Sequence, residues 1–174
     1  MNAATSSGEG LGVVIRQAHL DDMRSIVTLH SRTVAVGYQA IFPPGPPPTP
    51  ATLEPGWRSL LDRDEVVVLV AEISSGQVVG TVVLEPEDQG VWLKRLHVDP
   101  DHWGGGVGSI LHDQAIATAH HRGYETLNLW VLERNDRARR MYERRSWTLV
   151  PGRTLANDPP SVVDVLYRRI LGQT

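Results

Sequence analysis

Three strand-like runs in the middle of the chain constrain its fold more than any other feature. They cover residues 65–72, 78–84 and 91–98, and short polar turns at 74–77 and 86–90 separate them. Turns of this length join neighbouring antiparallel strands. The chain is therefore expected to form a sheet whose first half is antiparallel.

The pattern changes after Pro100, where a helix follows the last of these strands. Apolar residues repeat at helical spacing over 107–119, and Gly123 provides a C-terminal cap. The next strand is expected over 124–132. A right-handed crossover through this helix would place the strands at 91–98 and 124–132 parallel to each other. Ligands tend to bind at such a point in a sheet.

The remaining elements complete a sheet of about seven strands. The spacing of apolar residues predicts a first strand over 13–16, a helix from Asp21, a second helix over 52–61, a helix capped by Asn135, and strands over 147–150 and 162–167. We expect an α/β (α+β) fold in a single domain over residues 11–172. A small, polar stretch at 1–10 is expected to be a disordered leader.

Composition excludes several classes of protein. The 174 residues include no cysteine, which excludes disulfides, thiolate metal sites and a cysteine nucleophile. A net charge of −3 argues against a general nucleic-acid or acidic-membrane binder. The longest apolar run, 66–71, is too short to span a bilayer. The histidines lack the His-Glu-x-x-His spacing of a zinc site, so no metal ligand is assigned. A cytoplasmic protein is expected.

A glycine-rich turn joins the strand at 91–98 to the helix after it. Residues 102–109 contain four glycines. Unpaired backbone N–H groups at a helix start suit such a turn to binding phosphate. A Walker loop has a lysine between its last glycine and the following serine or threonine, and here Ser109 follows Gly108 directly. A dinucleotide fingerprint has a third glycine three residues after the second, and here Ser109 stands three residues after Gly106. Neither motif is therefore matched. A flexible turn without a ligand is the alternative.

Further residues accompany this turn at fixed spacing. Leu96-His97-Val98-Asp99-Pro100 precedes it, and the residues that follow it are Asn135, Ala138, Tyr142, Glu143 and Trp147. Together they resemble the acetyl-CoA signature of the GNAT superfamily of N-acetyltransferases. The resemblance implies a mixed, mostly antiparallel sheet of about seven strands. It also implies flanking helices and a sheet splayed between its fourth and fifth strands.

The resemblance implies an acetyl-CoA site with two parts. The backbone of Leu96, His97 and Val98 would pair with the pantetheine arm and polarise the thioester carbonyl. Backbone N–H groups at the helix start would hold the pyrophosphate, and the residues expected there are Gly104, Gly105, Gly106, Val107, Gly108 and Ser109. Trp103 departs from the family, which usually has Gln or Arg at that position. One polar contact to phosphate is therefore in question.

Tyr142 matches the family's tyrosine seven residues after the motif asparagine, Asn135. The resemblance implies that its phenol protonates or hydrogen-bonds the departing thiolate. A purely structural tyrosine is the alternative. Asn135 is expected both to cap its helix and to contact coenzyme A. Since no cysteine can carry the acyl group, direct attack in a ternary complex is expected, by a primary amine of a small molecule or peptide.

The general base is not identified by the resemblance. Trp92 occupies the position at which some family members carry a catalytic carboxylate. Candidates near the strand ends are Glu85, His97, Asp99 and Glu133.

The region before a proline-rich run at 43–50 lines the acceptor site in this family. Tyr38, Phe42 and Trp92 are the residues expected to contact the acceptor. Two other functions stay open: a non-catalytic acyl-CoA-binding sensor or structural protein of the same fold, and an interaction protein recognised through its prolines. The resemblance is also compatible with a homodimer.

Overall fold

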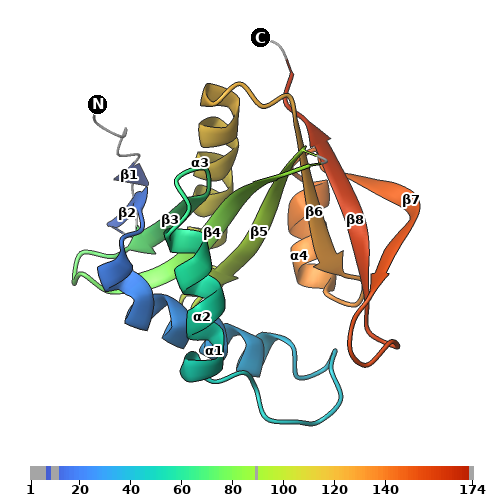
Figure 1. The fold of residues 1–174 in the computed structure, drawn as a ribbon, viewed down its shortest axis with the longest axis horizontal. Coiled ribbons are helices and arrows are strands. Elements are labelled where there is room, and N and C mark those ends of the chain that lie inside the picture. The colour runs from blue at the N-terminus through green and yellow to red at the C-terminus, as the bar shows by residue number, and fades with distance from the viewer. Residues whose placement is uncertain (1–6, 9–11, 89, 173–174) are drawn as a thin grey trace.

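A central sheet organises the molecule, which a computed structural model describes at residues 7–8, 12–88 and 90–172. Its strand order is β1-β2-β3-β4-β5-β6-β8-β7 (Figure 1). The strands are β1 (Ser7–Gly8), β2 (Val13–Gln17), β3 (Val67–Glu72), β4 (Val78–Glu87), β5 (Gly90–Val98), β6 (Thr126–Leu132), β7 (Thr148–Ala156) and β8 (Val163–Ile170).

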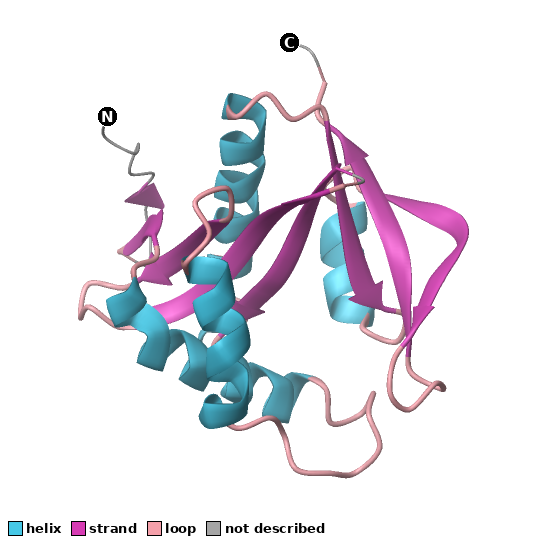
Figure 2. Cartoon of the chain, viewed as in Figure 1, coloured by secondary structure: helices cyan, strands magenta, loops and turns pink. Residues whose placement is uncertain are grey.

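Four α-helices pack against this sheet (Figure 2). They are α1 (Met23–Gly37) after the 3-10 turn η1 (Leu20–Asp22), α2 (Pro50–Leu61), α3 (Val107–His121) after η2 (Pro100–His102), and α4 (Asp136–Glu143). The proline-rich run forms a loop except at its end, where Pro50 begins α2. Proline is tolerated at a first helical position because its missing N–H would be unpaired there, and Thr49 caps the helix.

Strand β3 is buried on both faces of the sheet. Val67, Leu69 and Ala71 belong to the core beneath α3 and α4, whereas Val68 and Val70 belong to the core beneath α1 and α2. Successive residues of a strand point to opposite faces. A strand covered on both faces has no polar face, which explains the unbroken apolar run seen in the sequence.

The one parallel pair among the described strands is β5 with β6. They pair only at Val91 with Leu127 and at Trp92 with Asn128. Beyond these residues the two strands diverge, as Figure 1 shows. The expected fold, a mixed and mostly antiparallel sheet splayed at the crossover, is confirmed. After Trp92, the edge of β5 that faces β6 therefore has no partner among the described strands.

The amino-terminal stretch is described only in part. Ser7 and Gly8 pair with β2, although they fall within the expected leader, and residues 1–6 and 9–10 lie outside the described residues. The boundary of the domain therefore stays a prediction. Among the described residues, no helix combines the length and apolar character needed to cross a bilayer.

Gly80 lets α3 pack directly against β4. A Cβ atom at this position would lie 2.6 Å from Leu111 Cδ1 and 3.2 Å from the carbonyl oxygen of His97. We expect Gly80→Ala to lower the free energy of unfolding by about 1–3 kcal/mol, because a packed core resists added volume. Urea denaturation measures this. Gly56→Ala in α2, where the nearest atom would be 3.8 Å away, is the control and should not destabilise. Equal stability of both variants would contradict the packing argument.

Candidate active site

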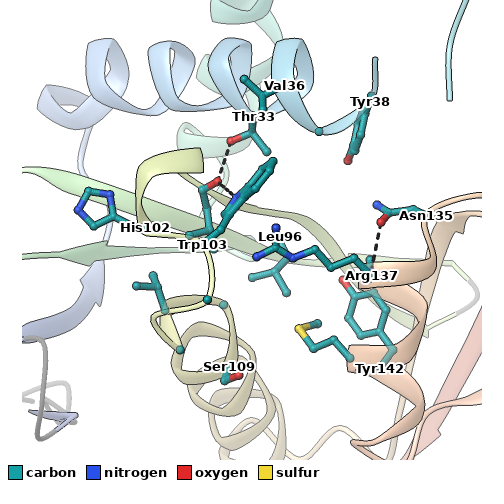
Figure 3. A pocket seen from close by; sticks show the side chains of 18 of the residues that line it. Thr33, Val36, Tyr38, Leu96, His102, Trp103, Ser109, Asn135, Arg137 and Tyr142 are labelled. Carbon is teal, nitrogen blue, oxygen red and sulfur yellow. Dashed lines mark hydrogen bonds between the residues drawn. The ribbon is translucent and has the colours of Figure 1, made fainter. Parts of the chain in front are cut away.

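A pocket of about 500 Å³ lies between the free edge of β5, the start of α3 and α4 (Figure 3). It brings together residues that the sequence had placed far apart along the chain. Those expected from the sequence that line it are Tyr38, Leu96, Val98, Gly104, Gly106, Val107, Gly108, Ser109, Asn135 and Tyr142. His97, Gly105, Phe42 and Trp92 do not line this pocket.

The start of α3 presents its backbone amides to this pocket. Gly104 and Gly106 have φ values of 83° and 85°, which side chains other than glycine rarely adopt. Gly106 is the N-cap of α3 and supplies no side chain to its first turn, and the first intrahelical bond runs from Ile110 to the Gly106 carbonyl at 3.0 Å. The N–H groups of residues 107–109 are therefore available to a ligand, and an anion would also interact with the helix dipole.

The charge of the pocket differs from that of the chain. The whole sequence carries a net charge of −3. Among the residues that the structure describes, by contrast, the pocket is lined by Arg137 and Arg144 and by no aspartate or glutamate. Neither arginine was predicted from the sequence, and their position on the helix capped by Asn135 is the signal that could have indicated them. The pocket therefore favours an anionic ligand.

Trp103, which departs from the family pattern, makes a specific contact. Its indole N–H donates to the carbonyl oxygen of Val98 at 2.7 Å. The hydroxyl of Thr33 lies 3.1 Å from the same oxygen and 2.8 Å from the carbonyl oxygen of Leu29, and shares its proton between them. The carbonyl of Val98 is thus satisfied within the protein. A ligand that pairs with the open edge of β5 must use other backbone groups.

Tyr142 lines the pocket and packs beside the rings of Trp147 and His112. Trp147 packs edge-on against it with ring centroids 5.8 Å apart, and the Trp147 indole N–H donates to Nε2 of His112 at 2.9 Å. Asn135 places α4, since its side chain accepts from the N–H of Ala138 at 3.2 Å. Burial raises the pKa of Tyr142 above its usual value. The phenol is therefore protonated at neutral pH.

A family model described as the acetyltransferase (GNAT) family matches residues 33–147, well over half of the chain. The chain belongs to this family. The matched segment contains the open edge of β5, the glycine-rich turn and Tyr142.

Relatives and solved structures agree with this assignment. The chain is 36% identical over 90 residues to an uncharacterized N-acetyltransferase of Archaeoglobus fulgidus, covering 48% of this chain and 60% of that protein. It is 34% identical over 110 residues to a mycothiol acetyltransferase of Jonesia denitrificans, covering 58% of this chain and 34% of that protein. The chain thus spans only part of these curated relatives.

The fold is shared with a PaiA N-acetyltransferase from Thermoplasma acidophilum whose structure contains coenzyme A. The two match with a TM-score of 0.69 at 14% identity, over 91% of this chain and 99% of that chain.

The acceptor residues expected of a GNAT member lie in two different places. Tyr38 lines the pocket, while Phe42 packs beside it in a cluster with Ile41, Leu132 and Val162. Burial and the nearby charge of Asp164 on β8 raise the pKa of Tyr38. Trp92 instead lines a separate cavity of about 550 Å³ and stacks on Trp130, with ring centroids 6.0 Å apart. A contact between Trp92 and the acceptor stays a prediction.

Three carboxylates were candidates for the general base, and two of them form ion pairs within the protein. Glu85 forms ion pairs with Arg63 and Lys94. Burial raises the pKa of Glu85, but these hydrogen bonds outweigh it and hold the pKa below its usual value. Asp99 is buried and pairs with Arg32 at 3.0 Å. Glu133 is exposed.

The fourth candidate, His97, is buried against α1. It stacks on His30 with ring centroids 4.2 Å apart, and the Trp57 indole N–H donates to His30 Nδ1 at 3.0 Å. Burial, the neighbouring ring and Arg95 hold the pKa of His97 well below its usual value. None of the four groups is therefore placed in the pocket as an accessible base, and the described residues contain no cluster of three or more metal-ligating side chains.

The histidine pair predicts a loss of stability in acid. Burial lowers the pKa of His30 to about 4, and that of His97 also lies below its usual value. Between about pH 6.5 and pH 4 the unfolded chain therefore binds protons that the folded protein does not, so the free energy of unfolding should fall as pH falls. Urea denaturation at pH 7 and pH 5 measures this. His30→Gln should reduce the difference in the free energy of unfolding between the two pH values. An unchanged difference would contradict the role of the buried histidines.

Proposed function

We propose that the protein is an N-acetyltransferase that transfers an acetyl group from acetyl-CoA to a primary amine of a small molecule or peptide. One observation carries the proposal: a single pocket combines the free amides of α3, two arginines and the buried phenol of Tyr142, and its described lining includes no carboxylate. The amides and arginines suit a phosphate-bearing ligand, and the phenol suits a step that releases an anion.

The residues present fit acetyl-CoA. The amides of Val107, Gly108 and Ser109 would bind the pyrophosphate, and the edge of β5 at Leu96 would pair with the amides of the pantetheine arm. When bound, acetyl-CoA supplies a thioester whose acetyl carbon forms a bond to the acceptor nitrogen while the carbon–sulfur bond breaks.

Tyr142 would stabilise the departing sulfur. A thiol has a pKa of about 8.5 and an ordinary phenol about 10. Because burial raises the pKa of Tyr142 further, complete proton transfer from its phenol to the thiolate is uphill. Its main role is therefore to donate a hydrogen bond to the developing thiolate, which strengthens as negative charge accumulates on sulfur.

The acceptor would approach from the side of Tyr38. A primary amine with a pKa of about 10.4 is almost entirely protonated at neutral pH, so it must lose a proton before it attacks. With Glu85 and Asp99 held in ion pairs and His97 buried, we infer that water in the pocket carries this proton away. Direct attack is the route that a chain without cysteine allows.

Calorimetric titration tests the ligand part of this proposal. Acetyl-CoA should bind with a dissociation constant of about 1–100 μM, and ATP and NAD should bind far more weakly, because the turn lacks the residues of their fingerprints. Failure to bind acetyl-CoA would overturn the proposal. Binding without any coenzyme A release in the presence of amines would favour the non-catalytic acyl-CoA-binding alternative.

A further inference from the structure

Trp103 and Arg137 meet across the mouth of the pocket. The guanidinium carbon of Arg137 lies 4.4 Å from the centroid of the Trp103 ring, a cation–π contact. Trp103 follows η2 on the side of β5 and α3, whereas Arg137 belongs to the first turn of α4 on the side of β6. Figure 3 shows the arginine reaching over the pocket from α4.

The guanidinium of Arg137 makes no ion pair and no hydrogen bond within the part of the chain that the structure describes. Two neighbouring arginines are engaged: Arg139 donates to the Tyr167 hydroxyl at 3.1 Å, and Arg145 pairs with Asp113 at 3.3 Å. Arg144 also lines the pocket, but the contact with Trp103 is made by Arg137. An aromatic ring contacts the face of a guanidinium and leaves its N–H groups at the edge free. Arg137 can therefore be positioned by Trp103 and still bind an anion.

The contact also places positive charge beside the start of α3. Trp103 immediately precedes Gly104, and Gly106, two residues further, is the N-cap of the helix. Arg137 and the free amides of residues 107–109 line one pocket, in which none of the described lining residues carries a carboxylate. An anion at this end of the pocket would be held by backbone donors on one side and by a guanidinium on the other.

We propose that Arg137 binds the pyrophosphate of coenzyme A and that Trp103 positions it. The inference rests on the proposed function. It answers the question raised by Trp103, because the polar side chain missing from the start of the glycine-rich turn is supplied from α4. Arg137 would be a binding residue, and Trp103, acting through it, a positioning residue.

Binding measurements on coenzyme A and 3′-dephospho-coenzyme A test this proposal, because both carry the pyrophosphate and only the first carries the 3′-phosphate. Arg137→Ala should raise the dissociation constants of both ligands about tenfold, as expected for loss of a charge-assisted hydrogen bond. It should also make the dissociation constant less sensitive to salt. Arg140→Ala, which removes the same charge from an exposed position on α4 outside the pocket lining, should change neither ligand by more than about twofold.

A second set of variants tests the role of Trp103. In a Trp103→Ala background, Arg137→Ala should lower the affinity for coenzyme A by less than about tenfold, because the guanidinium is no longer held in place. The same tenfold loss in both backgrounds would show that Trp103 does not position Arg137. Thermal denaturation checks that each variant is folded.

The remaining outcomes separate this inference from the proposed function. If Arg137→Ala weakens the binding of coenzyme A but not that of the dephospho form, Arg137 contacts the 3′-phosphate and the proposal is wrong. If Arg137→Ala and Arg140→Ala bind both ligands as the unaltered protein does, the proposal also fails while the proposed function stands. Failure of the unaltered protein to bind coenzyme A would overturn the proposed function itself.

Discussion

Gly106→Glu is expected to reduce the affinity for acetyl-CoA at least about 100-fold, because placing like charges together costs several kcal/mol. Gly106 is the N-cap of α3 and lines the pocket, so the new carboxylate would lie where the pyrophosphate is expected to bind. It would also compete with the ligand for the free amides of the first turn. Isothermal titration calorimetry with acetyl-CoA measures the loss.

Gly123→Glu is the matched control for this variant. Gly123 lies just beyond the other end of α3 with a φ of 79°, close to the 85° of Gly106, and a Cβ at either position would meet no atom within 4 Å. Both variants therefore impose similar backbone strain and the same change in charge. The control should bind acetyl-CoA within about twofold of the unaltered protein. Normal binding by a folded Gly106→Glu variant would rule out the start of α3 as the phosphate site.

Tyr142→Phe is expected to lower kcat by about 100-fold or more while the dissociation constant of acetyl-CoA changes less than about twofold. The variant keeps the ring that packs against Trp147 and removes only the hydroxyl. The lost hydrogen bond matters chiefly when charge develops on sulfur, so the rate falls more than the affinity. Because burial raises the pKa of Tyr142, its ionisation should not reduce kcat of the unaltered protein up to about pH 10.

Tyr124→Phe provides the control for loss of a hydroxyl. Tyr124 lies after the far end of α3 and does not line the pocket. Tyr124→Phe should have the same kcat as the unaltered protein. Steady-state assays of coenzyme A release, with binding measured separately, distinguish the two variants. Unchanged kcat in Tyr142→Phe would leave Tyr142 as a structural residue and remove it from the mechanism.

Much of the architecture follows from local patterns in the sequence. Strands β3, β4 and β5 were predicted because their apolar runs are bounded by short turns, and the cap at Asn135 was predicted because its side chain can satisfy a free amide of the next helix. Such signals act over a few residues. The start of α2 was missed, because a proline that ends one pattern can also begin a helix.

The pocket could be predicted less completely, because tertiary packing decides which side chains from distant elements meet in it. The glycine-rich turn is visible in the sequence, whereas the contact of Arg137 with Trp103 joins two elements that are distant along the chain. His112 was missed for the same reason, since its side chain accepts a hydrogen bond from Trp147, which lies beyond β6 and α4 along the chain. Trp92 was placed near the acceptor from a family position, but its side chain lies in a separate cavity with Trp130.

The most direct test of the account is transfer of a labelled acetyl group. The unaltered protein would be incubated with acetyl-CoA carrying a ¹³C-labelled acetyl group and a panel of small primary amines and peptides, and products would be identified by mass spectrometry. We expect at least one N-acetylated product bearing the label, formed in step with free coenzyme A and strongly reduced in Tyr142→Phe. Acetyl-CoA that binds but yields no labelled amine across the panel would contradict it.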